Sequence, residues 1–108
     1  MKMIIAIIQN DDERALLNKL MKEGFRATKL ASTGGFLRTG NTTLMLGVED
    51  DRLDEALMLI RETCKTRKVT LPSYPYAMET GMHVVYPVET KIGGATIFVM
   101  PVEQKLNL

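Results

Sequence analysis

The order of apolar and polar residues at the start of the chain predicts a buried strand followed by an amphipathic helix. Residues 3–9 are apolar except for the last one, and a run without polar alternation is typical of a central strand buried on both faces. In the polar stretch 10–13, Asn10 offers a capping side chain and the acidic residues suit a helix N-terminus. Gly24 is expected to end this helix in the left-handed cap conformation. The helix is expected to bury the apolar residues that recur at helical spacing: Ala15, Leu16, Leu20 and Met21.

Two further strands and a second helix are predicted between residues 25 and 65. Residues 25–32 alternate and contain threonine and aromatic residues, and glycines then interrupt the pattern before a strand-like run at 42–48. The acidic residues 49–51 begin a second helix, which we expect to end near Lys65. One face of that helix carries Leu53, Ala56, Leu57, Ile60 and Cys64.

The last part of the chain is predicted to hold a long loop and two strand-like segments. Between Thr66 and Met82 the periodicity is lost while Pro, Tyr and Gly accumulate, which predicts a loop of the kind that often carries function. Residues 83–91 and 95–102 are strand-like, and Gly93-Gly94 separates them. This glycine pair indicates either a turn or bulge between strands, or a close backbone approach to a ligand or a neighbouring subunit.

The succession of elements predicts an α+β fold of the ferredoxin-like βαββαβ type. In that fold both helices cover one face of an antiparallel sheet and leave the other face bare. Because the first strand is apolar on both sides, and because two helices cannot cover both faces of the sheet, we expect the chain to form oligomers.

Composition and charge narrow the class of protein. The 108 residues, of which 45% are hydrophobic, suffice for one domain spanning residues 1–108 and are too few for two. A formal net charge of +1 provides no basic field that would hold a nucleic-acid polymer. Cys64 is the only cysteine and no apolar run approaches roughly twenty residues, so we expect a cytoplasmic protein without a membrane partner. Residues 1–9 resemble the start of a signal peptide, but acidic residues follow without a cleavage site, which favours a strand.

Candidate chemistry concentrates between residues 26 and 43, where the residue types suit a phosphorylated ligand that carries a base. On a strand, Arg26 and Thr28 project from the same face, so a guanidinium and a hydroxyl meet one phosphate or base edge. Gly34 and Gly35 allow backbone N–H groups to approach an anion closely.

The same segment also offers surfaces for a base. Phe36 and Leu37 form an apolar pair in a turn, where a purine ring is one thing that would cover them, and Asn41 presents a donor and an acceptor to a base edge. The alternative is an ordinary hairpin loop in which Phe36 packs on the core and Arg26 is a surface cation. Spacing alone slightly favours this alternative, because a Gly-Gly pair is a weak signal.

Signals for catalysis or for a metal site are weak. His83 has no partner at ligand spacing, and Cys64 falls on the apolar face of the second helix. Asp50 and Asp51 are explained by the start of that helix. Ser32 lacks a neighbouring base. We therefore expect neither enzymatic activity nor a metal or cofactor.

Three runs of residues, taken together, form a pattern specific enough to indicate a protein family: Arg26-Ala27-Thr28-Lys29-Leu30-Ala31, Thr33-Gly34-Gly35-Phe36-Leu37-Arg38 and Gly40-Asn41-Thr42-Thr43. They resemble the PII-like cyclic-di-AMP receptors of Gram-positive bacteria, which are related to the nitrogen-regulatory PII proteins. The resemblance extends over nearly the whole chain apart from the middle loop and the tail, with further matches at residues 3–7, 47–48, 51–52, 86–89, 93–96 and 98–101.

This resemblance implies a signal-transduction protein: a homotrimer that binds one cyclic-di-AMP in each cleft between subunits and signals to an unknown downstream protein. The loop after the second helix rearranges on binding in that family. The ligand contacts in the family come from the positions of Arg26, Thr28, Gly35, Phe36, Leu37, Asn41 and Gly47.

The chain departs from the receptors at three places. Gly24 stands where they carry Asn before the Phe-Arg pair, the segment 66–82 lacks their Pro-Met-Gly-Gly-Asn-Ala-Asp pattern, and the tail 103–108 does not reproduce their terminal Gln. The alternative function is a PII-like protein-interaction module that binds another nucleotide, or only a protein through residues 74–82.

Overall fold

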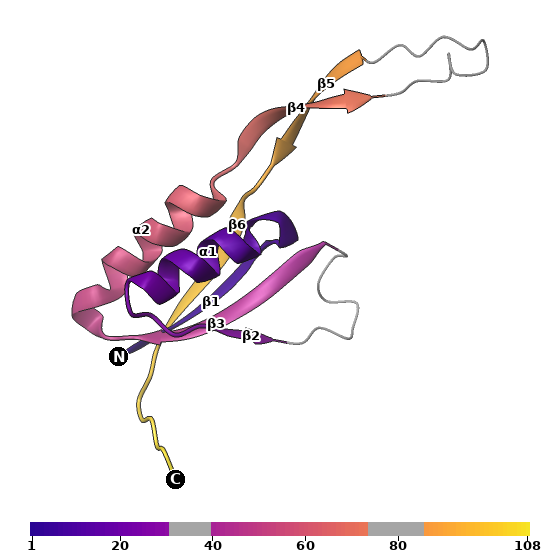
Figure 1. Cartoon of the computed structure of the whole chain (residues 1–108). Helices are drawn as coiled ribbons and strands as arrows, with labels where there is room; N and C mark the ends of the chain where they lie inside the picture. Colours follow the sequence, from indigo (N-terminus) through magenta and orange to yellow (C-terminus); the bar gives the residue numbers. More distant parts are fainter. Residues whose placement is uncertain (31–39, 74–85) are drawn as a thin grey trace.

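A four-stranded antiparallel sheet carries two helices on one face (Figure 1). The computed structural model of the chain describes residues 1–30, 40–73 and 86–108. The sheet order is β2-β3-β1-β6, which is the ferredoxin-like order with β6 as its last strand. The α+β class and the βαββαβ succession are therefore as expected. The strands are β1 (Lys2–Gln9), β2 (Thr28–Leu30), β3 (Asn41–Val48) and β6 (Ala95–Pro101), and the helices are α1 (Asn10–Lys22) and α2 (Leu53–Cys64), the latter preceded by a 3₁₀ turn, η1 (Asp50–Arg52).

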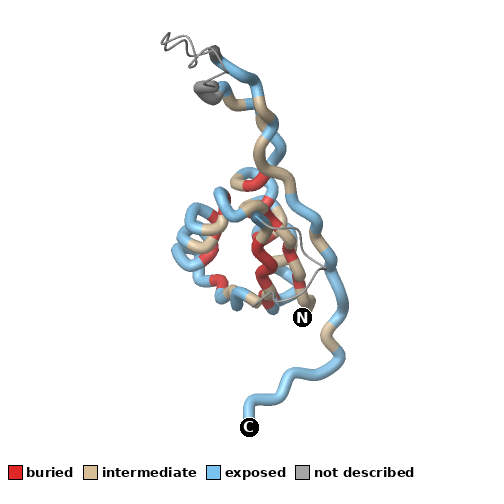
Figure 2. The backbone as a smooth tube through the Cα atoms, turned by 90° about the vertical axis from the view of Figure 1, so that its right-hand side faces the viewer, coloured by how far each residue is buried: buried red, intermediate tan, exposed pale blue. Residues whose placement is uncertain are grey.

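The core lies between the helices and one face of the sheet, where buried residues meet in the centre of the molecule (Figure 2). Alternate residues of β1 point into it, and Ile4, Ala6 and Ile8 are all buried. The predicted apolar face of α2 is confirmed, because Ala56, Ile60 and Cys64 are buried and the other two members pack against the core. The remaining core residues are Leu16, Leu20, Phe25, Leu44, Leu46 and Val48.

The opposite face of the sheet is apolar and is covered by neither helix. The register sets Ile5 of β1 between Met45 of β3 and Phe98 of β6, and side chains paired in this way share a face. Phe98 is 51% exposed. The prediction that β1 is buried on both faces therefore holds within one chain for one face only. We call this surface the open face; its apolar members are Met3, Ile5, Ile7, Met45, Phe98 and Met100.

A two-stranded ribbon, β4 (Arg67–Ser73) with β5 (Tyr86–Ile92), projects from the body between α2 and β6 (Figure 1). The predicted loop at residues 66–82 is therefore wrong for residues 67–73; its residues 74–82 and residues 83–85 of the expected strand lie outside the described part. The strand was not predicted because β4 is ordered by its hydrogen bonds to β5. Such a strand does not need the alternation of apolar and polar residues that burial of one face would impose. The projection raises the radius of gyration to 18.4 Å, where a compact chain of this length has about 13 Å.

Two details of the first helix differ from expectation. Asn10 is the first residue of α1 and makes no cap, and the residue before it has no side-chain capping bond either. Ala15 and Met21 are exposed, so the buried stripe of α1 is narrower than predicted.

Gly24 has a φ of +83°, which confirms the left-handed end of the helix. Phe25 is buried, and its N–H donates to the Leu20 carbonyl at 2.8 Å, so that β2 begins only at Thr28.

Candidate ligand-binding site

Three of the predicted site residues lie on the open face of the sheet. Thr28 pairs with Met45, while Asn41 and Gly47 lie at even separations from Met45 along β3. Because side chains alternate along a strand, all three positions belong to the same side, opposite the helices. Strand geometry therefore groups these residues on the surface that has no cover within the chain.

The same geometry separates two of them within one chain. Asn41 is the first residue of β3 and Gly47 is six residues further on, so their Cα atoms lie about 20 Å apart along the strand. Thr28 is near the Gly47 end, because it pairs with a residue two positions from Gly47. A ligand that touches both ends of β3 needs contacts from more than one chain, or a length close to that of the strand.

Arg26 lies apart from the open-face residues, just before β2. It is exposed, and the expectation that it shares a strand face with Thr28 is wrong, because β2 begins at Thr28. It lines a hollow of about 190 Å³ between α1 and the chain that enters β2, together with Leu17, Met21 and Phe25. Three further predicted residues, Gly35, Phe36 and Leu37, lie outside the described residues.

The backbone that leads to Arg26 is held by Arg52, which the sequence reading missed. The Arg52 guanidinium stacks 4.1 Å from the centroid of the Phe25 ring and donates to the Glu23 carbonyl at 2.7 Å. It also pairs with Glu55 through two hydrogen bonds of 3.0 Å, and this hydrogen-bonded arginine lowers the pKa of the Glu55 carboxyl. The spacing of three between Arg52 and Glu55 is a readable helix signal, whereas the contact with Phe25 has no local signal.

The Asn41 end of β3 borders a second hollow of about 260 Å³. Gln9, Gly93, Gly94 and Thr96 line it together with Asn41. The Gln9 side-chain oxygen Oε1 accepts a hydrogen bond of 2.7 Å from the Gly93 N–H, and Gln9 pairs with Asn41 in the ladder. Glycine backbone, a carboxamide and a hydroxyl are groups that suit the polar parts of a nucleotide.

A chain of polar contacts fixes β2 and β3 on the helix side of this end. Glu13 meets the Lys29 ammonium at 2.9 Å and accepts a hydrogen bond from the Thr42 hydroxyl at 3.1 Å, while that hydroxyl also lies 2.5 Å from Oδ1 of Asn10. The hydrogen bond from Lys29 lowers the pKa of the Glu13 carboxyl. These contacts connect the first turn of α1 with both strands that carry predicted site residues.

The turn that was one alternative for the pair Gly93-Gly94 is present in the structure. Both residues have positive φ, +89° and +98°, so the pair forms a turn. A Cβ atom on Gly93 would lie 2.5 Å from the Lys65 carbonyl oxygen and 3.0 Å from that of Cys64. The Gly94 N–H donates to the Cys64 carbonyl. Within the chain, the pair therefore lies close to the end of α2.

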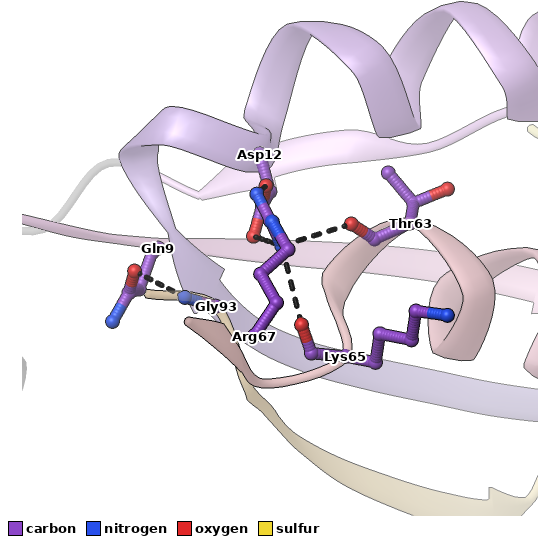
Figure 3. Close-up of polar contacts among 6 residues, drawn as sticks. All are labelled: Gln9, Asp12, Thr63, Lys65, Arg67 and Gly93. Carbon is purple, nitrogen blue, oxygen red and sulfur yellow. Dashed lines mark hydrogen bonds and ion pairs between the residues drawn. The ribbon is translucent and has the colours of Figure 1, made fainter. Parts of the chain in front are cut away.

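Arg67 fastens the base of the ribbon beside this turn (Figure 3). Its guanidinium donates to the Asp12 carboxylate at 2.5 Å and reaches the Thr63 and Lys65 carbonyl oxygens at 3.4 and 3.2 Å. Asp12 is buried, with 4% of its side chain exposed, whereas 34% of the Arg67 side chain is exposed. The hydrogen bond to Asp12 raises the pKa of the Arg67 guanidinium above its ordinary value.

The described residues offer no metal-binding group of three or more ligating side chains. Cys64 is buried, and its burial raises the pKa of the thiol to about 11, as suits the core role expected for it. Asp50 pairs with the N-terminal ammonium at 3.0 Å. Neither α1 nor α2 has the length and apolar composition that a bilayer crossing requires.

Comparison with known proteins identifies the family. A family model described as cyclic-di-AMP receptor matches residues 1–108. The chain belongs to the cyclic-di-AMP receptor family. This confirms the resemblance to the PII-like receptors and makes the chain a cyclic-di-AMP-binding signal protein.

A solved structure supports the fold of this receptor. The crystal structure of a functionally unknown protein from Pediococcus pentosaceus ATCC 25745 is similar to it with a TM-score of 0.78 and 38% sequence identity. The similarity covers 99% of this chain and 96% of that chain.

Proposed function

We propose that this receptor is a homotrimer that binds one cyclic-di-AMP in each cleft between neighbouring subunits. The ligand-binding residues are Arg26, Thr28, Gly35, Phe36, Leu37, Asn41 and Gly47. The observation that carries the proposal is the position of Thr28, Asn41 and Gly47 on the open face, at the two ends of β3. Oligomerisation over that face places one subunit's residues against those of its neighbour.

The apolar character of the open face favours a second and third copy of the same chain as its cover. Phe98 is 51% exposed and Met100 is 40% exposed, and both lie in the regular strand β6, which has no buried residue. Because about half of each residue is already covered, burying the rest contributes roughly 0.7–1.5 kcal/mol each. A closed ring of identical subunits buries every open face without leaving one exposed.

The chemistry of the described residues suits a cyclic dinucleotide. Arg26 is an exposed guanidinium that can pair with one of the two phosphates, and Thr28 adds a hydroxyl on the open face. Asn41 offers both a donor and an acceptor to an adenine edge. Gly47 has no side chain and is exposed, so its backbone is accessible to a flat ring.

Isothermal titration with cyclic-di-AMP tests the ligand, with ATP, AMP and cyclic-di-GMP as competitors. We expect selective binding of one ligand per chain, lost in Arg26→Ala and retained in Arg61→Ala, which removes an exposed arginine from the last turn of α2. A Gly24→Asn variant is expected to bind more tightly. Absence of heat with every nucleotide from a folded oligomer would contradict the receptor proposal and favour the protein-interaction module.

Light scattering of size-separated protein tests the assembly. We expect the mass of three chains for the natural sequence and for Met58→Asp, whose side chain is 60% exposed on α2. Phe98→Asp places a charge on the open face and is expected to give smaller species that no longer bind cyclic-di-AMP. If Phe98→Asp remains a trimer with full affinity, the open face is not the subunit interface.

A further inference from the structure

The corner between β1 and α1, residues 9–13, contacts two parts of the chain that are distant in sequence. On one side, the Asn10 N–H donates to the Gly40 carbonyl at 2.8 Å, next to the start of β3. On the other side, Gln9 accepts the Gly93 N–H at 2.7 Å and Asp12 binds Arg67 at 2.5 Å (Figure 3). One short segment thus meets both the Asn41 end of the sheet and the base of the ribbon.

Both strands of the ribbon are fastened at this base. Arg67 begins β4 and Gly93 follows the last residue of β5, and the ladder closes the base by pairing Arg67 with Ile92. The guanidinium is held by a buried carboxylate and by two carbonyl oxygens at the end of α2. A planar guanidinium that donates to several fixed acceptors holds the start of β4 in one orientation, whereas the flexible ammonium group of a lysine would not.

The ribbon base and the proposed ligand residue Asn41 also line the same hollow of about 260 Å³. Gln9 lies between them, because its backbone pairs with Asn41 and its side chain binds Gly93. Any group that enters this hollow and shifts Asn41 therefore acts on the side chain that anchors β5.

We propose that the β1–α1 corner is a coupling joint, in which Gln9, Asp12 and Arg67 are positioning residues that set the ribbon relative to the Asn41 end of β3. The part of this inference that concerns cyclic-di-AMP rests on the proposed function. The contacts that form the joint are present in the chain without a ligand and can be tested without one. Because coupling is reciprocal, loosening the ribbon base loosens the start of β3, and a ligand at Asn41 tightens the ribbon base.

Hydrogen exchange of the full ligand-free chain, followed by mass spectrometry, tests the joint. Gln9→Ala removes the acceptor for Gly93, and Arg67→Lys keeps the charge but loses the fork. In both variants we expect exchange about tenfold faster at residues 67–69 and 90–93, and also at residues 41–44 of β3. Gln9→Glu keeps an acceptor oxygen and is expected to restore protection at both places, while Arg61→Lys is expected to change neither.

The outcome at β3 decides the proposal. Faster exchange confined to the ribbon would show that the contacts hold the ribbon alone and would overturn the joint. Faster exchange spread evenly over α2 and residues 46–48 would show general destabilisation and would overturn it as well. Only a rise shared by the ribbon base and residues 41–44, and reversed in Gln9→Glu, supports the joint.

A second arm adds cyclic-di-AMP at saturation, with binding measured by titration of the same samples. We expect the ligand to slow exchange at the ribbon base in the natural sequence, and to do so much less in Arg67→Lys while still binding. Binding without any change at the ribbon base would overturn the ligand-dependent part and leave the proposed function intact. If no ligand binds, the proposed function fails and the ligand-free exchange pattern alone decides the joint.

Discussion

Replacing Gly93 by alanine places a methyl group where the fold has no room. The added Cβ would lie 2.5 Å from the Lys65 carbonyl oxygen and 3.0 Å from that of Cys64, whereas carbon–oxygen contacts are comfortable from about 3.3 Å. Relieving such overlap costs about 1–3 kcal/mol, and a left-handed alanine about 1–2 kcal/mol more. The stiffer unfolded chain returns about 0.4–1 kcal/mol. These terms add to about 1–5 kcal/mol, so we expect Gly93→Ala to lower the free energy of unfolding by an amount in that range, near about 3 kcal/mol.

Gly40→Ala is the matched control, because it separates the backbone term from the steric term. Gly40 has a φ of +98°, but no atom of the described residues lies within 4 Å of a Cβ built there. Only the conformational cost applies, so we expect a loss of about 1 kcal/mol. Urea unfolding followed by circular dichroism gives both values, at one chain concentration because assembly contributes to stability. Losses that agree within about 0.5 kcal/mol would refute the assignment of Gly93 as a close-approach position.

Three further outcomes follow from single contacts. Arg67→Ala leaves the buried Asp12 carboxylate without its cation, and we expect urea unfolding to show about 2–3 kcal/mol of destabilisation. This is below the range of about 3–5 kcal/mol for fully buried pairs, because the Arg67 side chain is 34% exposed. A loss under about 0.5 kcal/mol contradicts this expectation. Cys64, buried and with its pKa raised to about 11, is expected to react with iodoacetamide at neutral pH far more slowly in the folded protein than in urea, and equal rates by mass spectrometry contradict this. The hydrogen bond from Lys29 lowers the pKa of the Glu13 carboxyl from its ordinary value of 4.5. The contact therefore stabilises the fold above pH 4.5, and this contribution is lost as the pH falls through the pKa that Glu13 has in the folded protein. In Lys29→Met we expect the free energy of unfolding to fall less steeply with decreasing pH, and an unchanged dependence in the acid range contradicts this.

The elements that the sequence predicts well are those whose packing imposes a period. The buried stripe of α2 follows from its one apolar face, and β1 is recognised as a strand by its unbroken apolar run, although only alternate residues of β1 are buried within one chain. Gly24 is readable as a helix end because its left-handed φ is a local property. The ribbon strand β4 has no such signal, because its partner supplies the order and residues 67–70 face no core.

The candidate site is only partly readable for a related reason. That Thr28 shares a face with Asn41 and Gly47 depends on the register between β2 and β3, which a single strand does not reveal. The pairing of Asp12 with Arg67 spans 55 positions and connects a helix start with a strand start, so no local motif announces it. Long-range polar contacts of this kind are fixed by the topology, and they become visible only once the sheet order is known.

Gly24 bears on how strongly the site binds. Its φ of +83° is one that Asn also adopts, and a Cβ there would make an ordinary contact of 3.8 Å with Nη1 of Arg52. Gly and Asn therefore fit the same backbone, and the exchange removes a side-chain amide without moving Phe25 or Arg26. One missing hydrogen bond weakens binding by about 1 kcal/mol, which is less than tenfold in Kd. A larger deficit relative to receptors that carry Asn would have to arise in residues 74–82 or in the tail, where the sequence also departs from theirs.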